Sequence, residues 1–266
     1  NTLTMKEILV NCLGGLMSVV GQNLRLVISP DENMELVKIR TKFSIEKEGN
    51  SSIVLIKDLF SEESRDLLVI LKIRKVAGND GEELPLFKNT FSYENIITGN
   101  SDKISKIAYI KLTNKECEDK SNLILDEQRN RMDMLDELEK ANKYAESGNL
   151  TEANDYINKL KANLKNTTSA NTSYTKIILN DLDYVQKEFT NDYAYKTKGS
   201  KMFDDKFSTH MNQRNNAALE KFEDSDNMEN NGIINDDDLL NIKSRNLGCN
   251  VYCNSYQMNM QKKCRK

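Results

Sequence analysis

The spacing of apolar residues changes once along this chain, close to residue 117, and that change limits the folds open to it. Before this point apolar and polar side chains alternate, which is typical of strands buried on one face. After it, apolar residues recur at intervals of three and four, which is typical of helices packed on one side. The sequence therefore predicts an α+β chain in which a β-rich region precedes a helical one.

The β-rich region contains six or seven short alternating segments, each bounded by Gly, Asn, Asp or Ser. This number and spacing of strands favours an antiparallel β-sandwich of about seven strands. No long helical pattern separates the segments, which argues against a parallel sheet. The expected strands lie within residues 16–28, 34–40, 43–48, 51–58, 65–75, 84–93 and 103–112.

The helical region carries four patterns, which predict a hairpin or bundle. The polar run NTTSANTS at residues 166–173 is predicted to be a spacer between the second and third helices. The apolar positions of the four patterns are Leu123, Met134, Leu135, Leu138, Ala141 and Ala145; then Ala153, Ile157, Leu160 and Leu164; then Tyr174, Ile178, Leu182, Val185, Phe189 and Tyr193; and last Met202, Phe203, Phe207 and Met211.

The stretch ESGNLTEANDYINKL, within residues 146–160, fits half of a tetratricopeptide unit. Gly148 allows a close turn and Ala153 admits a neighbouring helix. An array of such units needs about three copies to bury a continuous core. The segment near residue 182 carries no second copy, so the pattern predicts one isolated helical hairpin.

The last part of the chain, residues 220–266, is predicted to be a flexible tail that is acidic first and basic later. Cys249, Cys253 and Cys264 lie in it, without a nearby His or a fourth thiol, so free thiols are expected rather than a zinc site. An odd total of five cysteines favours a reducing compartment.

No catalytic, cofactor-binding or metal-ligating residue is predicted. The chain has one histidine, His210, expected to be a partly exposed structural residue, and it contains none of the common nucleotide-binding, hydrolase or zinc motifs.

Two other charged segments leave alternatives open. Glu62, Glu63 and Asp66 fit a hairpin connection fixed by an Arg–Glu pair, or the acidic groups of a hydrolase. Arg129 and Arg131 fit contacts to the sandwich or to a partner.

The overall charge and hydropathy exclude several classes of protein. The net charge of −3 gives no electrostatic footprint for nucleic acid. No apolar run is long enough for a membrane span, and no secretory signal is present, so a cytoplasmic protein is expected. Because the chain begins at Asn1 rather than Met, we expect it to be a fragment.

Four blocks of sequence carry a resemblance to a known family. They are NCLGGLMSVVGQNLRLVI, VLIKDLFSEESRDLLVILKI, EQRNRMDMLDELEKANKYAESGNLTEA and YAYKTKGSKMFDDKFSTHMNQRNNA. In this order they resemble the region that follows the von Willebrand factor A (vWA) domain in a group of eukaryotic intracellular proteins. That group includes plant RING-finger vWA ubiquitin ligases and vWA proteins with an intein-like domain.

The resemblance implies a division of the chain. Residues 1–15 would include the last helix of a preceding vWA domain, residues 16–116 would form a β-sandwich accessory domain, and residues 117–219 would form the helical segment called Vwaint. It also implies structural rather than catalytic roles for Gly14, Gly15, Asp58, Glu63, Arg65, Gly148 and Ala153. The Asp-x-Ser-x-Ser metal motif, the RING finger and the splice site of the family are absent from this chain.

Three functions follow as hypotheses. The first is a non-catalytic protein-interaction or scaffolding region that contacts an upstream vWA domain and an unknown protein partner. The second is an adaptor in a ubiquitin-ligase assembly. The third is a carboxylate-based hydrolase.

Overall fold

The computed structural model describes residues 13, 16–74, 78–114, 122–214 and 252. The chain divides into two compact units, one formed by Gly15–Ser121 and the other by Asn122–Lys266 together with Asn1–Gly14. Two of the predicted regions, the helix before residue 15 and the tail with its three cysteines, lie outside the described residues except for Leu13 and Tyr252. Each unit is considered by itself below.

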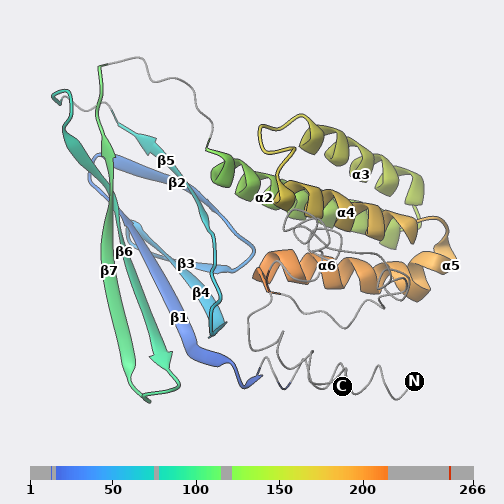
Figure 1. Ribbon diagram of the computed structural model, residues 1–266, viewed down its shortest axis with the longest axis horizontal. Coiled ribbons are helices and arrows are strands. Elements are labelled where there is room, and N and C mark those ends of the chain that lie inside the picture. Colours follow the sequence, from blue (N-terminus) through green and yellow to red (C-terminus); the bar gives the residue numbers. More distant parts are fainter. Residues whose placement is uncertain (1–12, 14–15, 75–77, 115–121, 215–251, 253–266) are drawn as a thin grey trace, which may run out of the picture. The chain divides into compact units, whose positions relative to one another are not determined.

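The first unit is a sandwich of two antiparallel sheets, as the alternating pattern predicts (Figure 1). The larger sheet has five strands in the order β3-β4-β1-β6-β7, and the smaller sheet pairs β2 with β5. The seven strands are β1 (Val19–Pro30), β2 (Met34–Arg40), β3 (Ser44–Glu48), β4 (Ser51–Phe60), β5 (Leu68–Ile73), β6 (Glu83–Asn95) and β7 (Ser101–Lys111).

The core of the sandwich comes from alternate residues of the central strands. Leu24 of β1 lies opposite Ile56 of β4, and the next pair on that face is Leu26 with Val54. Side chains directly opposite in an antiparallel pair share one face of the sheet. Ile39 of β2 joins this cluster from the smaller sheet, so the two sheets pack across one apolar layer.

The connection from β4 to β5 differs from the expected hairpin. β4 belongs to the larger sheet and β5 to the smaller one, so this segment crosses from one sheet to the other. The predicted Arg–Glu pair is present within it. Arg65 Nη2 lies 2.7 Å from Glu63 Oε2, and their side chains are 6% and 3% exposed. Glu63 Oε2 also accepts the backbone N–H of Phe60 at 2.8 Å, so the pair ties the crossover to the end of β4.

The second unit is helical, in agreement with the change of period. Among the described residues, none of its helices is long and apolar enough to cross a membrane. The helices are α2 (Leu123–Glu146), α3 (Leu150–Lys165), α4 (Ser173–Lys187), the short α5 (Asp192–Ala194), a π-helical turn (Tyr195–Gly199) and α6 (Ser200–Asn212). α2 is the longest, and it contacts α3, α4 and α6.

The predicted hairpin joins α2 to α3 at Gly148. This residue has φ = +82°, in the left-handed region that favours glycine. Ala141, Ala145 and Ala153 are at most 1% exposed, and small side chains of this kind let two helices approach closely. Asn149 caps α3, because its side chain accepts the N–H of Glu152.

The third helix is shorter than its apolar pattern suggests. α4 ends at Lys187, with Glu188 as its C-cap, and the side chain of Asn191 caps the next turn. Phe189 is therefore buried in a connection rather than on α4, and Tyr193 lies on α5 with 78% of its surface exposed. The extension of α4 to these two residues was wrong, because helical spacing alone does not register a cap between them.

The polar run 166–173 is packed into the unit rather than acting as a spacer. Ser169 within it is fully buried. Its hydroxyl accepts a hydrogen bond from the amide nitrogen of Asn130 on α2 at 2.8 Å, and its backbone N–H donates to Asp126 at 2.8 Å. Thr175 at the start of α4 is also fully buried and lies 3.1 Å from the Ser169 hydroxyl. These contacts attach the connection between α3 and α4 to the first turns of α2.

Candidate functional site

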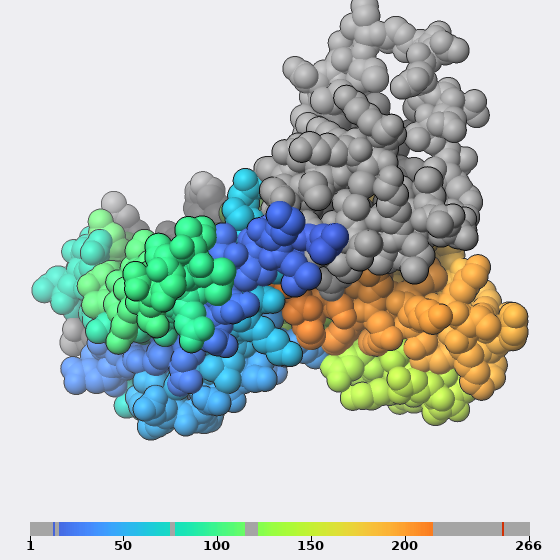
Figure 2. Space-filling view, turned by 90° about the horizontal axis from the view of Figure 1, so that it is seen from below, coloured from blue at the N-terminus to red at the C-terminus, as the bar shows by residue number. Residues whose placement is uncertain are grey.

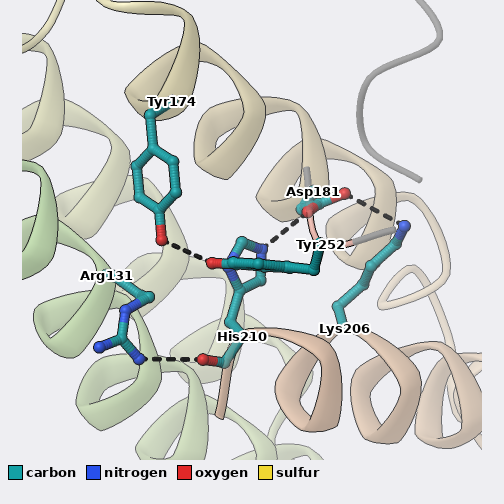
Figure 3. Close-up of polar contacts among 6 residues, drawn as sticks. All are labelled: Arg131, Tyr174, Asp181, Lys206, His210 and Tyr252. Carbon is teal, nitrogen blue, oxygen red and sulfur yellow. Dashed lines mark hydrogen bonds and ion pairs between the residues drawn. The ribbon is translucent and has the colours of Figure 1, made fainter. Parts of the chain in front are cut away.

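The largest concentration of buried charge lies between α4 and α6. Asp181 occupies the buried side of α4, among Ile177, Ile178, Leu182 and Val185. Lys206 and His210 lie four residues apart on α6 and therefore on one face of it. We call Arg131, Tyr174, Asp181, Lys206, His210 and Tyr252 the buried polar cluster, and Figure 3 shows their arrangement. Tyr174 and Tyr252 are half-buried, and the other four are buried.

Asp181 is the centre of this cluster (Figure 3). Its Oδ2 atom lies 2.8 Å from Nε2 of His210, and its Oδ1 atom lies 3.1 Å from Nζ of Lys206. The three side chains are 7%, 2% and 7% exposed, in the order Asp181, His210, Lys206. Two oxygens of one buried carboxylate thus hold two groups of α6, so the contact joins α4 firmly to α6.

The environment decides the charge of Asp181. Burial by itself raises the pKa of this carboxyl group, but the hydrogen bond and charge of His210, followed by the charge of Lys206, outweigh it. The pKa of Asp181 therefore lies below its usual value. An ionised carboxylate only accepts hydrogen bonds, so Nε2 of His210 carries the proton in their contact.

Arg131 fits neither of the two expected roles, because it contacts its own helical unit. The residue is 2% exposed. Its Nη1 atom donates to the backbone carbonyl of His210 at 3.0 Å, and its Nε atom donates to Gln128 at 2.7 Å. The carbonyl belongs to the last turn of α6, where a basic side chain is favourable. Arg129, two residues earlier, is exposed.

Tyr252 brings a residue from far along the chain to this cluster. Its hydroxyl lies 2.5 Å from the hydroxyl of Tyr174 at the start of α4. Its ring meets the ring of His210 edge-on, with centroids 5.9 Å apart. Burial, followed by the neighbouring Tyr174, raises the pKa of the Tyr252 hydroxyl well above its usual value.

The position of His210 corrects the sequence-based expectation. It is buried rather than partly exposed, because its ring lies against Asp181 and Tyr252. Asp181, Lys206 and Tyr252 were not predicted at all. Asp181 and Lys206 did leave a signal, since each is a charged residue at a position that the 3.6-residue period assigns to the apolar face. Tyr252 left none, because its contacts span 78 residues of sequence.

The cluster pairs a buried carboxylate with a histidine, a combination that also occurs in acid–base sites. A histidine that activates a nucleophile needs the nucleophile at the nitrogen opposite the carboxylate. Nδ1 of His210 is buried and has no hydrogen-bond partner among the residues that the structure describes. The contacts of the cluster join α4 to α6 through Asp181. Arg131 caps the last turn of α6, and Tyr174 and His210 hold Tyr252 in place.

The acidic residues of the β4–β5 crossover are divided between two environments. Glu63 is held inside by Arg65, whereas Glu62 and Asp66 are exposed to solvent. Within the described residues, no group of three or more His, Cys, Asp or Glu side chains is placed to hold a metal ion.

Comparison with known proteins gives a limited result. No family model matches the chain, and no curated protein matches it. A von Willebrand factor type A protein from Catenulispora acidiphila overlaps 66% of this chain and 40% of its own, with 10% identity and a TM-score of 0.44. The ArnB paralog VWA2 from Sulfolobus acidocaldarius overlaps 69% of this chain and 42% of its own, with 13% identity and a TM-score of 0.37. The chain thus spans about two fifths of the length of each of these proteins. Structural similarity at these low TM-scores supports no argument about function.

Proposed function

We propose that this chain is a non-catalytic protein-interaction region that accompanies a vWA domain. The association with such a domain is supported by the four sequence blocks, whose order matches that of the accessory region. A β-sandwich followed by helices is the architecture that this resemblance implies, and the chain has it.

The observation that carries the interaction role is the outer strand of the larger sheet, which pairs with another described strand on one side only. β7 is the last strand in the order, and Ile104, Ile107 and Tyr109 on it are 53%, 46% and 55% exposed. In Figure 2, which looks at the sandwich from the end of these strands, the green atoms of the β6–β7 hairpin lie at the surface. Exposed apolar side chains along a sheet edge are typical of surfaces that another protein covers.

The proposal of a non-catalytic role is supported by the burial and the contacts of His210, the only histidine in the sequence. His210 is 2% exposed, and Asp181 holds its Nε2 atom. Asp181 is engaged by Lys206 as well. A substrate would have to separate α4 from α6 to reach these groups.

The interaction role is tested by binding with the upstream sequence attached. We expect the protein that carries the vWA domain and this chain to retain a partner in a pulldown, and to lose it when residues 16–217 are deleted. Replacement of residues 220–248 by a Gly-Ser linker of equal length is the control, because it keeps Tyr252, and it should leave binding intact. Unchanged binding without residues 16–217 would contradict the proposal.

The non-catalytic role needs a separate test. We expect no turnover of nitrophenyl esters or phosphates above the rate of buffer alone. A turnover that disappears in the double variant Glu62→Gln, Asp66→Asn would instead favour the carboxylate-based hydrolase.

A further inference from the structure

The outer strand β7 offers more than exposed side chains, because its backbone is open along one edge. β7 pairs with β6 on one side, and no described strand pairs with it on the other (Figure 1). A strand in this position presents a row of N–H and C=O groups that another extended chain can bind. The site is 11 residues long, which exceeds the length of an average strand.

The hydrogen bonds at both ends of the β6–β7 pair show which backbone groups are open. Asn95 donates its N–H to Asn100 at the turn, and Leu112 donates its N–H to Glu82 at the other end. In an antiparallel ladder the residues of one strand point alternately toward and away from the partner strand. Even-numbered residues of β7 therefore bond to β6. The groups of Lys103, Ser105, Ile107 and Tyr109 face the open edge.

The side chains of β7 are apolar on both faces of the sheet. Ile104 lies opposite Phe91, which packs on the sandwich core, so the even-numbered side chains share the inner face. Ile107 and Tyr109 are on the outer face. An added strand would therefore meet apolar side chains above and below the sheet, at alternate positions.

Positive charge predominates on β7 itself. β7 carries Lys103, Lys106 and Lys111. Its one acidic residue, Asp102, is already bonded to the amide of Asn95 at 2.8 Å. On the neighbouring β6, Lys88 lies opposite Ile107, whereas Glu83 lies opposite Lys111 and Glu94 lies opposite Ser101. The excess of positive charge is therefore concentrated on the middle of β7, around Lys103 and Lys106. The edge is therefore complementary to an acidic segment.

A second copy of this chain matches the edge poorly. In the antiparallel register that overlaps β7 fully with itself, Lys106 lies opposite Lys106. A displacement of one strand by two residues places Lys103 opposite Lys111. Like charges directly opposite each other destabilise a strand pair, and lysines on edge strands prevent self-association for this reason.

We infer that β7 binds an extended, acidic segment of a partner protein, which adds to the larger sheet as a further strand. Apolar residues of that segment pack beside Ile104, Ile107 and Tyr109, and its carboxylates lie opposite the lysines. This inference rests on the proposed interaction role and names the chemistry of the partner.

The experiment uses the whole chain and a synthetic peptide of about ten residues in which Glu-Glu and Val-Val pairs alternate, so that both residue types lie on each face of the added strand. This length matches a typical strand. Residue-resolved amide exchange by NMR is the readout. Without peptide, we expect fast exchange at Lys103, Ser105, Ile107 and Tyr109 and slow exchange at the even-numbered residues between them. With peptide, the four fast amides should become protected, because they gain acceptors on the added strand.

Two variants separate backbone pairing from charge. Ile107→Pro removes an N–H that faces the open edge and leaves the bonds to β6 in place, whereas Ile107→Val keeps that N–H as the control. Reversal of Lys103 and Lys106 to Glu keeps every backbone group and faces only the uncharged Ser92 and Asn89 on β6. The matched control reverses the exposed Lys38 and Lys47. We expect each test variant to weaken peptide binding by at least about tenfold and each control to change it by less than about twofold.

Several outcomes would overturn the inference. Equal binding of a Lys–Val peptide, protection elsewhere than β7, or unchanged binding by both test variants would each do so. Self-association that Ile107→Pro abolishes would assign the edge to a second copy instead. If the peptide does not bind β7 but the pulldown still shows that residues 16–217 retain a partner, this inference is refuted and the proposed function is not. The two failures can therefore be distinguished.

Discussion

The two units of this chain bury different kinds of side chain. The described part of the sandwich buries mainly aliphatic residues such as Leu24, Ile28 and Val54, together with Ser18, Ser52 and the side chains of the Arg65–Glu63 pair. The helical unit buries charged and amide side chains as well, namely Gln128, Asn130, Arg131, Asn142, Asp181, Lys206, His210 and Gln213. The sandwich thus depends mainly on apolar area, and the helices depend also on directional contacts.

This difference has a consequence for the effects of mutation. Apolar burial is non-directional, so the loss of one side chain costs its transfer free energy and the cavity left behind. A buried ion pair is different, because the loss of one member leaves the other charged and unpaired in a dry environment. Conservative changes should therefore be tolerated better in the sandwich than in the buried polar cluster.

The largest expected effect is that of Asp181→Asn. The change leaves Lys206 and His210 buried without their carboxylate, and we expect the free energy of unfolding of the helical unit to fall by about 3–5 kcal/mol. Hydrogen exchange by mass spectrometry during denaturant unfolding reads this unit separately from the sandwich. Asp183→Asn is the matched control on the same helix. Asp183 pairs with Lys161 at the surface, its side chain is 52% exposed, and we expect a change below about 1 kcal/mol. Equal effects of the two changes would show that the buried pair contributes little.

The same pair predicts a dependence on pH. The pKa of Asp181 is lower in the folded chain than its ordinary value of 3.8. Its contribution to stability is therefore complete above pH 3.8 and is lost as the pH falls through the lower folded value. Denaturant unfolding of the helical unit from pH 7 to pH 2 should show this loss in the natural chain and a smaller one in Asp181→Asn. Parallel pH profiles for the two proteins would contradict the assignment.

An apolar deletion in the sandwich tests the other half of the comparison. Leu24 is 2% exposed in the core of this unit. Its replacement by Ala should lower the unfolding free energy of the sandwich by about 3 kcal/mol. Val37→Ala is the control, because Val37 is 55% exposed and should matter by less than about 0.5 kcal/mol. The conservative Leu24→Met should cost less than about 1.5 kcal/mol, and a larger loss would mean that the sandwich is as sensitive to side-chain identity as the helices.

The two kinds of burial also explain how far the sequence could predict the structure. The strands and helices followed from apolar periodicity, since each element buries one face, and the turn at Gly148 followed from its residue type. The buried polar contacts did not follow. Asp181 meets partners 25 and 29 residues away, and nothing local marks which charged residue will face which. The connection at 166–173 reads as a polar spacer for the same reason, because its partner Asn130 is distant in sequence.

Asn130 allows a test of that distant contact. Its amide nitrogen lies 2.9 Å from the hydroxyl of Thr167 and 2.8 Å from that of Ser169. Asn130→Ala removes both contacts, and we expect a loss of about 1–3 kcal/mol together with faster amide exchange in residues 166–172. Asn158→Ala, which removes an exposed contact to Gln186, should change neither by a measurable amount. Unaltered exchange in 166–172 would mean that other contacts hold this connection.

The smallest expected effect should be the same in both units, because it concerns the backbone alone. Gly148 in the helical hairpin has φ = +82° and Gly49 in the β3–β4 turn has φ = +58°, and a Cβ atom at either position would meet no other atom within 4 Å. Replacement by Ala therefore adds only the strain of the left-handed conformation, about 1 kcal/mol at each site. Denaturant unfolding with exchange readout for each unit measures both. Similar losses of unfolding free energy at the two sites would mean that the units differ only in their buried side chains. A much larger loss at Gly148 would mean that the turn between α2 and α3 also contributes to the difference.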